Sequence, residues 1–237
     1  MSHSLRDTEK KFRTYMWGDK GLTALLILLL PAMFLSPFLE STLSRLLFAV
    51  LFSALLLSGV SNISTHLLPR FAAGLLVCVT IIIHCLHNFT SDHRLAAWAV
   101  FLSLLCFLLL TVVILKQVFQ DGPVTVAKIK GAVAVYILIG FSWSYIYRLI
   151  DLQLPMSFNI PPALNTLDEL NHTIDLTYFS FVTLTTLGYG DITAAHPLSR
   201  MFVIIEALIG QLYPATLLAR LVSLEIIHRE KQQAEIN

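Results

Sequence analysis

Charged residues are scarce in this sequence. Asp, Glu, Lys and Arg make up 13% of its 237 residues, whereas about 25% is usual for a soluble domain. Hydrophobic residues make up 56%, and the formal net charge is only +1. The composition therefore predicts a polytopic membrane protein, and the near-neutral charge gives no reason to expect a nucleic-acid partner.

Cysteine is also scarce, and the common catalytic motifs are absent. Three cysteines, Cys78, Cys85 and Cys106, lie inside apolar runs at spacings that fit neither a metal site nor a disulfide framework. We expect them to be small buried hydrophobic side chains. The sequence contains no zinc-binding His/Glu motif, no Ser/His pair in a recognisable context and no phosphate-binding loop. It is therefore not expected to encode an enzyme, and no cofactor is expected.

Long apolar runs are abundant instead. A helix needs roughly 17–25 apolar residues to span a bilayer, and six runs approximately meet this length: residues 21–39, 43–60, 71–87, 95–119, 131–150 and 198–224. A seventh run, residues 174–187, is too short to span, and we expect it to enter and leave the membrane on one side, covered by other protein. The predicted fold class is an all-α membrane protein with six transmembrane helices and one re-entrant helix and loop.

The distribution of Lys and Arg supports a topology with both termini in the cytoplasm. Cytoplasmic segments usually carry the excess of basic residues. This topology puts twelve of the 16 basic residues inside and four outside: Arg6, Lys10, Lys11, Arg13, Lys20, Arg70, Lys116, Lys128, Lys130, Arg220, Arg229 and Lys231 against Arg45, Arg94, Arg148 and Arg200. The polar N-terminal residues are expected to be a cytoplasmic segment and not a signal peptide.

A break at Gln-Asp-Gly-Pro, residues 120–123, divides the chain into two modules. Within the linker that follows, residues 124–130 are expected to form a short interfacial helix. The expected organisation is a cytoplasmic N-terminal segment (1–20), a four-helix module (21–120), a linker (121–130), a helix–loop–helix module (131–225) and a short cytoplasmic tail (226–237).

The loop at the end of the short apolar run reads Thr185-Thr186-Leu187-Gly188-Tyr189-Gly190-Asp191. Gly188 and Gly190 tolerate positive φ, which the backbone needs if successive carbonyl oxygens are to face one axis. A ring of such oxygens can replace the water shell of a dehydrated ion. A helix over residues 173–183, capped by Asn171 or Thr173, would direct the negative end of its dipole to the same axis.

This heptad is similar to Thr-Thr-Val-Gly-Tyr-Gly-Asp, the signature of the potassium-channel pore family. The resemblance covers about residues 131–225 and looks most like the prokaryotic members with a helix–loop–helix pore. It implies a homotetramer in the cell membrane, in contact with lipid, that passes K⁺ as a permeant ion. It also implies K⁺ coordination by the carbonyl oxygens of Thr186, Leu187, Gly188 and Tyr189 and by the Thr186 hydroxyl, in a filter completed by Gly190 and supported by Thr185 and Asp191.

Several positions depart from the family pattern. Leu187 replaces the valine of the signature, and Val182 replaces a glutamate that some bacterial members carry. The positions behind the filter that often hold aromatic ring donors are Tyr178 and Phe179; Tyr178 is expected to donate to Asp191, whereas Phe179 cannot bond to the filter tyrosine. Potassium-selective conduction is the expected function, and a weakly selective cation channel or a non-conducting regulatory subunit are the alternatives.

The last apolar run contains a glycine and a proline near its middle. Pro214 removes the helical hydrogen bond to the carbonyl of Gly210, so we expect a gating hinge there. Close helix packing at the glycine is the alternative. Gln211, Pro214, Leu218 and Val222 fall on one face, which is expected either to line a cavity below the filter or to face lipid or another helix.

Ionisable residues inside the apolar runs are few. Glu206 is an intramembrane acid, expected either to hydrogen-bond the back of the short helix or to sense ions or pH. The fourth apolar run contains only Lys116, with Arg94 just before it, so arginine-driven voltage gating is not expected. His84 and His87 are expected to be interfacial or pH-sensing. Any ligand control would come from lipid, pH, the N-terminal segment or a separate regulatory subunit.

Overall fold

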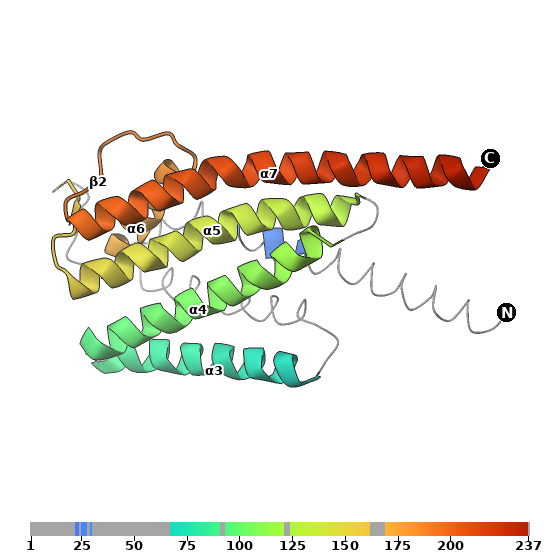
Figure 1. The fold of residues 1–237 in the computed structure, drawn as a ribbon. Helices are drawn as coiled ribbons and strands as arrows, with labels where there is room; N and C mark the ends of the chain where they lie inside the picture. Colours follow the sequence, from blue (N-terminus) through green and yellow to red (C-terminus); the bar gives the residue numbers. More distant parts are fainter. Residues whose placement is uncertain are drawn as a thin grey trace.

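The computed structural model describes residues 22, 23, 25–27, 29, 67–90, 93–120, 124–161 and 169–236. Five helices and one small sheet account for most of them (Figure 1). They are α3 (Leu67–Thr90), α4 (His93–Val118), α5 (Val126–Gln153), β1 (Phe158–Asn159), α6 (Glu169–Leu184), β2 (Thr193–Ala194) and α7 (Pro197–Ile236).

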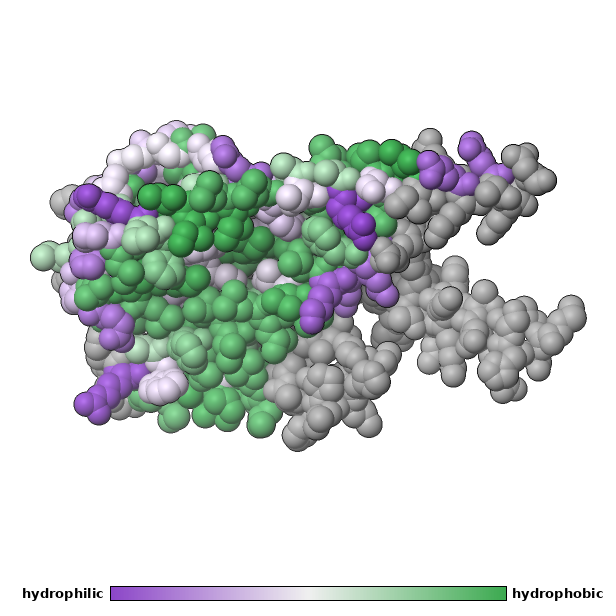
Figure 2. Space-filling view, in the orientation of Figure 1, coloured by the Kyte–Doolittle hydropathy of each residue, from purple (hydrophilic) through white to green (hydrophobic). Residues whose placement is uncertain are grey.

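Three of the described helices are long and apolar enough to cross a membrane. The apolar stretches are Arg94–Val118 in α4, Val126–Gln153 in α5 and Pro197–Ile226 in α7, and α3 contributes a shorter one, Gly74–His84. Figure 2 shows a broad hydrophobic surface over the middle of these helices, with hydrophilic residues toward both ends. A mostly helical membrane protein is therefore confirmed in outline. The predicted spans 21–39 and 43–60 lie outside the described residues, apart from six positions of the first.

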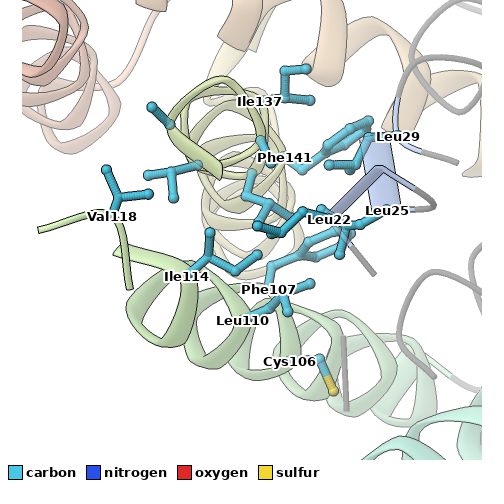
Figure 3. Packing of buried hydrophobic residues seen from close by; sticks show 14 of the residues in the cluster. Leu22, Leu25, Leu29, Cys106, Phe107, Leu110, Ile114, Val118, Ile137 and Phe141 are labelled. Carbon is cyan, nitrogen blue, oxygen red and sulfur yellow. The ribbon is translucent and has the colours of Figure 1, made fainter. Parts of the chain in front are cut away.

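A continuous hydrophobic core joins α4 to α5. Phe107 of α4 stacks on Phe141 of α5 with ring centroids 5.6 Å apart, and Leu22, Leu25 and Leu29 pack into the same cluster (Figure 3). All five side chains are almost completely buried. Helix α4 is thus packed directly on α5, with these three leucines in the same core.

The cysteines differ in their surroundings. Cys106 is buried in this core, as predicted, but the burial predicted for Cys78 is wrong, because Cys78 is exposed. Cys78 shares one face of α3 with Leu75 and Ile82, which are also largely exposed, since residues three and seven apart lie on the same side of a helix. The side chain of Cys85 lies outside the described part of the chain.

The start of α5 corrects one prediction about the linker. Thr125 caps the helix by accepting a hydrogen bond from the Lys128 backbone N–H, and α5 then runs without a break from Val126 to Gln153. Residues 124–130 therefore do not form a separate interfacial helix. Lys128 instead donates to the backbone oxygen of Gln120 at 2.7 Å, which ties the start of α5 to the end of α4.

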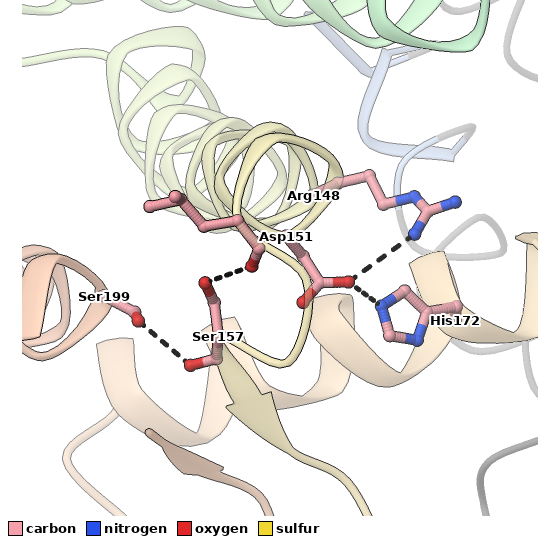
Figure 4. Close-up of polar contacts among 6 residues, drawn as sticks. Arg148, Asp151, Ser157, His172 and Ser199 are labelled. Atoms are coloured by element: carbon pink, nitrogen blue, oxygen red, sulfur yellow. Dashed lines mark hydrogen bonds and ion pairs between the residues drawn. The ribbon is translucent and has the colours of Figure 1, made fainter. Parts of the chain in front are cut away.

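A two-stranded antiparallel sheet, which the all-α prediction missed, connects α5 to the start of α7. Phe158 pairs with Ala194 and Asn159 with Thr193. The Ser199 hydroxyl of α7 donates to the Ser157 backbone oxygen at 3.0 Å (Figure 4). These contacts fix the position of the start of α7, which follows the loop that carries the heptad.

The ends of α6 and α7 also differ from the predicted boundaries. Helix α6 starts at Glu169 and not at residue 173. Asn171 and Thr173 therefore lie inside the helix, and neither is its N-cap. Helix α7 continues to Ile236, well beyond residue 224, so the predicted tail is mostly an extension of this helix.

Candidate functional site

The heptad loop begins directly after α6 and has an unusual backbone. Thr186, Gly188 and Gly190 have φ values of 59°, 58° and 79°, so every second residue is left-handed. In an ordinary strand successive residues alternate in direction, and a left-handed residue at every second position turns successive carbonyls toward one side. The two glycines were expected to adopt positive φ, and this is confirmed. For Thr186 it was not expected, because a β-branched residue rarely adopts this conformation.

Backbone hydrogen bonds fold the start of the loop back over the last turn of α6. The N–H groups of Leu187 and Gly188 both donate to the Val182 carbonyl, at 2.9 and 3.2 Å, and that of Thr186 donates to the Thr183 carbonyl at 2.9 Å. The carbonyl of Val182 is thus a main anchor of the loop. Sequence reasoning considered only its side chain and missed this role, because a backbone acceptor leaves no residue-type signal.

At the end of the loop, Tyr178 and Asp191 form the predicted contact. The Tyr178 hydroxyl donates to Asp191 Oδ2 at 2.7 Å, and the Ile192 backbone N–H donates to Asp191 Oδ1 at 3.0 Å. The Tyr178 hydrogen bond lowers the pKa of the Asp191 carboxyl below its ordinary value, and the same bond raises the pKa of Tyr178 to about 12. Asp191 therefore keeps its negative charge at the end of the loop to low pH.

Phe179 belongs to a buried aromatic cluster. Its ring lies 5.3 Å from that of Tyr147 on α5 and 5.5 Å from that of Phe158 on β1, measured between centroids. Edge-on and tilted ring pairs of this kind stabilise packing beyond the area they bury. Phe179 thus fixes α6 to α5 and the small sheet.

Glu206 of α7 lies behind α6 and is completely buried. The Tyr147 hydroxyl of α5 donates to its Oε2, and Ser180 Oγ of α6 lies 2.5 Å from its Oε1. The predicted contact between Glu206 and the back of the short helix is therefore present. Its partners were not predicted, because they are far away in the sequence and belong to no motif.

Gly210 marks a close crossing of α7 and α6. A Cβ atom added to Gly210 would lie 1.9 Å from the Leu184 carbonyl oxygen, so only glycine fits there. Tyr136 of α5 donates to the same oxygen at 3.1 Å. The geometry gives Gly210 a packing role, and α7 continues as a helix through Pro214; the gating hinge stays a prediction.

The remaining predicted residues lie at exposed positions. Gln211, Pro214, Leu218 and Val222 are all exposed on α7 in the single chain, which fits a cavity lining and a lipid-facing stripe equally well. Thr185 is exposed at the end of α6, and its hydroxyl donates to the Phe181 carbonyl at 2.6 Å.

A polar cluster joins the last turns of α5 to the first turns of α6, and sequence reasoning missed it. His172 Nε2 lies 2.6 Å from Asp151 Oδ2, and Arg148 Nη1 lies 3.9 Å from the same oxygen (Figure 4). The i, i+3 spacing of Arg148 and Asp151 is a recognisable helical pair. The histidine, 21 residues further on, could be placed only by the fold.

Together these features point to one class of protein. Two long apolar helices, α5 and α7, pack against a shorter helix that ends in a loop with left-handed residues at alternate positions, and this arrangement is consistent with a membrane channel. Residues 133–225 match the family model described as "Ion channel". The match covers most of α5, the loop and the first part of α7, and it supports an ion channel and not an enzyme. No curated protein and no solved structure matched the chain.

Proposed function

We propose that this chain is a subunit of a potassium-selective channel that conducts K⁺ passively, with the carbonyl oxygens of Thr186, Leu187, Gly188 and Tyr189 as the filter. The observation that carries the proposal is the left-handed conformation at Thr186, Gly188 and Gly190. A threonine held at positive φ costs of order 1–3 kcal/mol, and such strain clusters at functional sites. A row of carbonyls turned to one side is the arrangement that replaces the water of a K⁺ ion.

The position of α6 favours a cation at the inner end of this row. The helix ends at Leu184, directly before the filter, so the negative end of its dipole faces the place where the ion loses its water. In the proposed channel the Thr186 hydroxyl adds an oxygen at the inner mouth, and Asp191 adds a negative charge at the outer mouth.

Four copies around one axis are required, because one chain supplies one row of oxygens. Helix α7 has a surface for neighbours: only 11% of its most apolar stretch is buried within the chain, against 67% for α5. Leu187 and Tyr189 are also 56% and 69% exposed. We propose that neighbouring copies cover these surfaces in a homotetramer of the cell membrane, with both termini cytoplasmic, and that subunit counting will give four.

Rubidium uptake into liposomes tests the proposal. Gly188→Ala causes no steric clash within the chain, since no atom lies within 4 Å of the added Cβ. It does force an L side chain to adopt a φ of 58°. We expect wild-type liposomes to take up rubidium and the variant to lose most of this flux. The matched control is Gly74→Ala in α3, where the added Cβ also meets no atom and φ is not positive. Wild-type protein that passes no rubidium would refute the proposal.

The second candidate is a weakly selective cation channel. It is favoured by Phe179, which packs against Tyr147 and Phe158 and offers no hydrogen bond to the filter, and by the Leu187 replacement. Reversal potentials in mixed K⁺ and Na⁺ solutions distinguish the two kinds of channel. A reversal potential that shifts toward the K⁺ equilibrium potential supports K⁺ selectivity. A reversal potential near zero supports the weakly selective channel.

A further inference from the structure

Glu206 is the most deeply buried acid among the described residues, and three helices meet around it. It lies on α7, Tyr147 lies on α5 and Ser180 lies on α6. Glu206 and Ser180 are both fully buried. The three side chains form one connected polar network, because each hydroxyl contacts one carboxyl oxygen of Glu206.

Ser180 has a second contact within this network. Its Oγ lies 2.7 Å from the Gly140 carbonyl oxygen of α5 and 2.5 Å from Glu206 Oε1. A serine hydroxyl has one proton to donate. The Gly140 carbonyl can only accept, and an ionised carboxylate can only accept.

A count of protons shows what the geometry requires. The network has three contacts: Tyr147 to Glu206, Ser180 to Glu206 and Ser180 to Gly140. The two hydroxyls supply two protons, so an ionised Glu206 would leave one contact without a proton. A proton on Glu206 Oε1 removes the conflict, because Glu206 then donates to Ser180, Ser180 donates to Gly140 and Tyr147 donates to Oε2.

The surroundings of Glu206 agree with a neutral group. The ion pairs between described residues, Arg148–Asp151 and His172–Asp151, lie at the outer end of α5. In the described part of the chain the carboxyl of Glu206 therefore has no cationic partner, and a buried carboxylate without one is strongly disfavoured.

We propose that Glu206 is a neutral carboxylic acid whose proton is donated to Ser180, and that it acts as a positioning residue for the filter. Ser180 lies five residues before Thr185, so a contact that holds Ser180 also holds the end of α6. The positioning role rests on the proposed function, whereas the protonation of Glu206 does not.

Infrared spectroscopy of the channel in vesicles tests the protonation. At neutral pH we expect a carbonyl stretching band of a protonated carboxylic acid that is present in the wild type and absent in Glu206→Gln. Asp175→Asn is the matched control, since it removes a different acid, on α6, and should leave this band unchanged. A spectrum without a band sensitive to Glu206→Gln would overturn the proposal.

Ion selectivity tests the positioning role. Glutamine can donate to Ser180 and accept from Tyr147 as a neutral acid does, so Glu206→Gln should keep the K⁺/Na⁺ permeability ratio within about twofold. Glu206→Ala lacks both contacts, and the ratio should fall about tenfold or more. An unchanged ratio in Glu206→Ala would overturn the positioning role. Wild-type vesicles that pass no ions would instead refute the proposed function and leave the infrared result valid.

Discussion

The Asp191 carboxylate accepts hydrogen bonds from the exposed Tyr178 hydroxyl and from the Ile192 backbone N–H. The Tyr178 bond contributes most to the lowered pKa of Asp191, so the carboxylate persists as the pH falls. Tyr178→Phe removes the donor. We expect the acid-induced decrease in ion flux to occur at a higher external pH in this variant than in the wild type, which flux measurements across a series of external pH values will show.

Asp191→Asn provides the control for this titration, because it removes the charge at every pH. If Asp191 controls cation entry, the ion flux of the Asp191→Asn variant at neutral pH should resemble the flux of the wild type in acid. Identical pH profiles for Tyr178→Phe and the wild type would show that the hydrogen bond does not control the charge.

Asp175 on α6 has the opposite shift. Burial raises the pKa of its carboxyl to about 6, although nearby His172 opposes the effect, and its Oδ2 is buried without a hydrogen-bond partner among the described residues. An acid with a raised pKa destabilises the folded state above that pKa, and the penalty disappears below the ordinary value of 3.8.

Asp175→Asn should therefore raise the thermal unfolding midpoint by a few degrees at about pH 8 and by much less at about pH 4. Thermal unfolding of the purified protein in detergent at the two pH values measures the difference. An equal gain at both values would mean that the charge of Asp175 is not the cause.

Among the elements, α6 and α7 cross at Gly210, and of the described glycines this one leaves the least room for a Cβ atom. Gly210→Ala would place a Cβ atom 1.9 Å from the Leu184 carbonyl oxygen, so one helix must move. Overpacking of this kind costs about 1–3 kcal/mol, and we expect a lower unfolding midpoint together with weaker K⁺/Na⁺ discrimination. Gly74→Ala should change neither property. Wild-type stability of Gly210→Ala would contradict the tight crossing.

Pro214 lies one turn beyond this crossing. Substitution of Pro214 distinguishes the hinge hypothesis from a simple packing role. Alanine restores the backbone N–H and favours a helix by about 3 kcal/mol over proline. If the missing bond to Gly210 allows bending, Pro214→Ala should change the open probability several-fold without loss of stability. Single-channel recording measures this, and unchanged gating would remove the hinge and leave packing as the role of Gly210.

Length and hydropathy predicted helices where α3, α4, α5 and α7 lie, because a membrane helix must contain a long apolar run, and the shorter run 174–187 predicted α6. The helix boundaries and the short strands were harder to predict from the sequence. The start of α5 depends on the cap at Thr125, and the pairing of β1 with β2 involves two residues in each strand. Strands this short have no alternating pattern that a sequence could reveal.

For the molecule as a whole, local and distant features of the site were predictable to different degrees. The heptad loop is continuous in sequence, so the positive φ of its two glycines could be predicted from residue type, and the bond between Tyr178 and Asp191 could be predicted from the resemblance to the pore signature. The partners of Glu206 lie 59 and 26 residues away. Only the packing of α5, α6 and α7 brings them together, and no periodicity along the chain encodes that contact.

At the scale of the whole molecule, the charges of α4 bear on the expected response to voltage. Its 26 residues contain one arginine, Arg94, near the start and one lysine, Lys116, near the end. Each charge that crosses the full field contributes about 2.3 kcal/mol per 100 mV, and steep gating needs roughly 3–4 such charges in each of four subunits. Charges at the helix ends cross only a small part of the field.

We therefore expect the open probability to change by about tenfold or less per 100 mV, as recorded in planar bilayers with equal K⁺ on both sides. Lys116→Gln should reduce any remaining dependence of open probability on voltage, because it removes the one charge near the C-terminal end of α4. A steep curve that disappears in Lys116→Gln would show that α4 moves its lysine through most of the field. A steep curve that the variant keeps would place the voltage sensor outside α4.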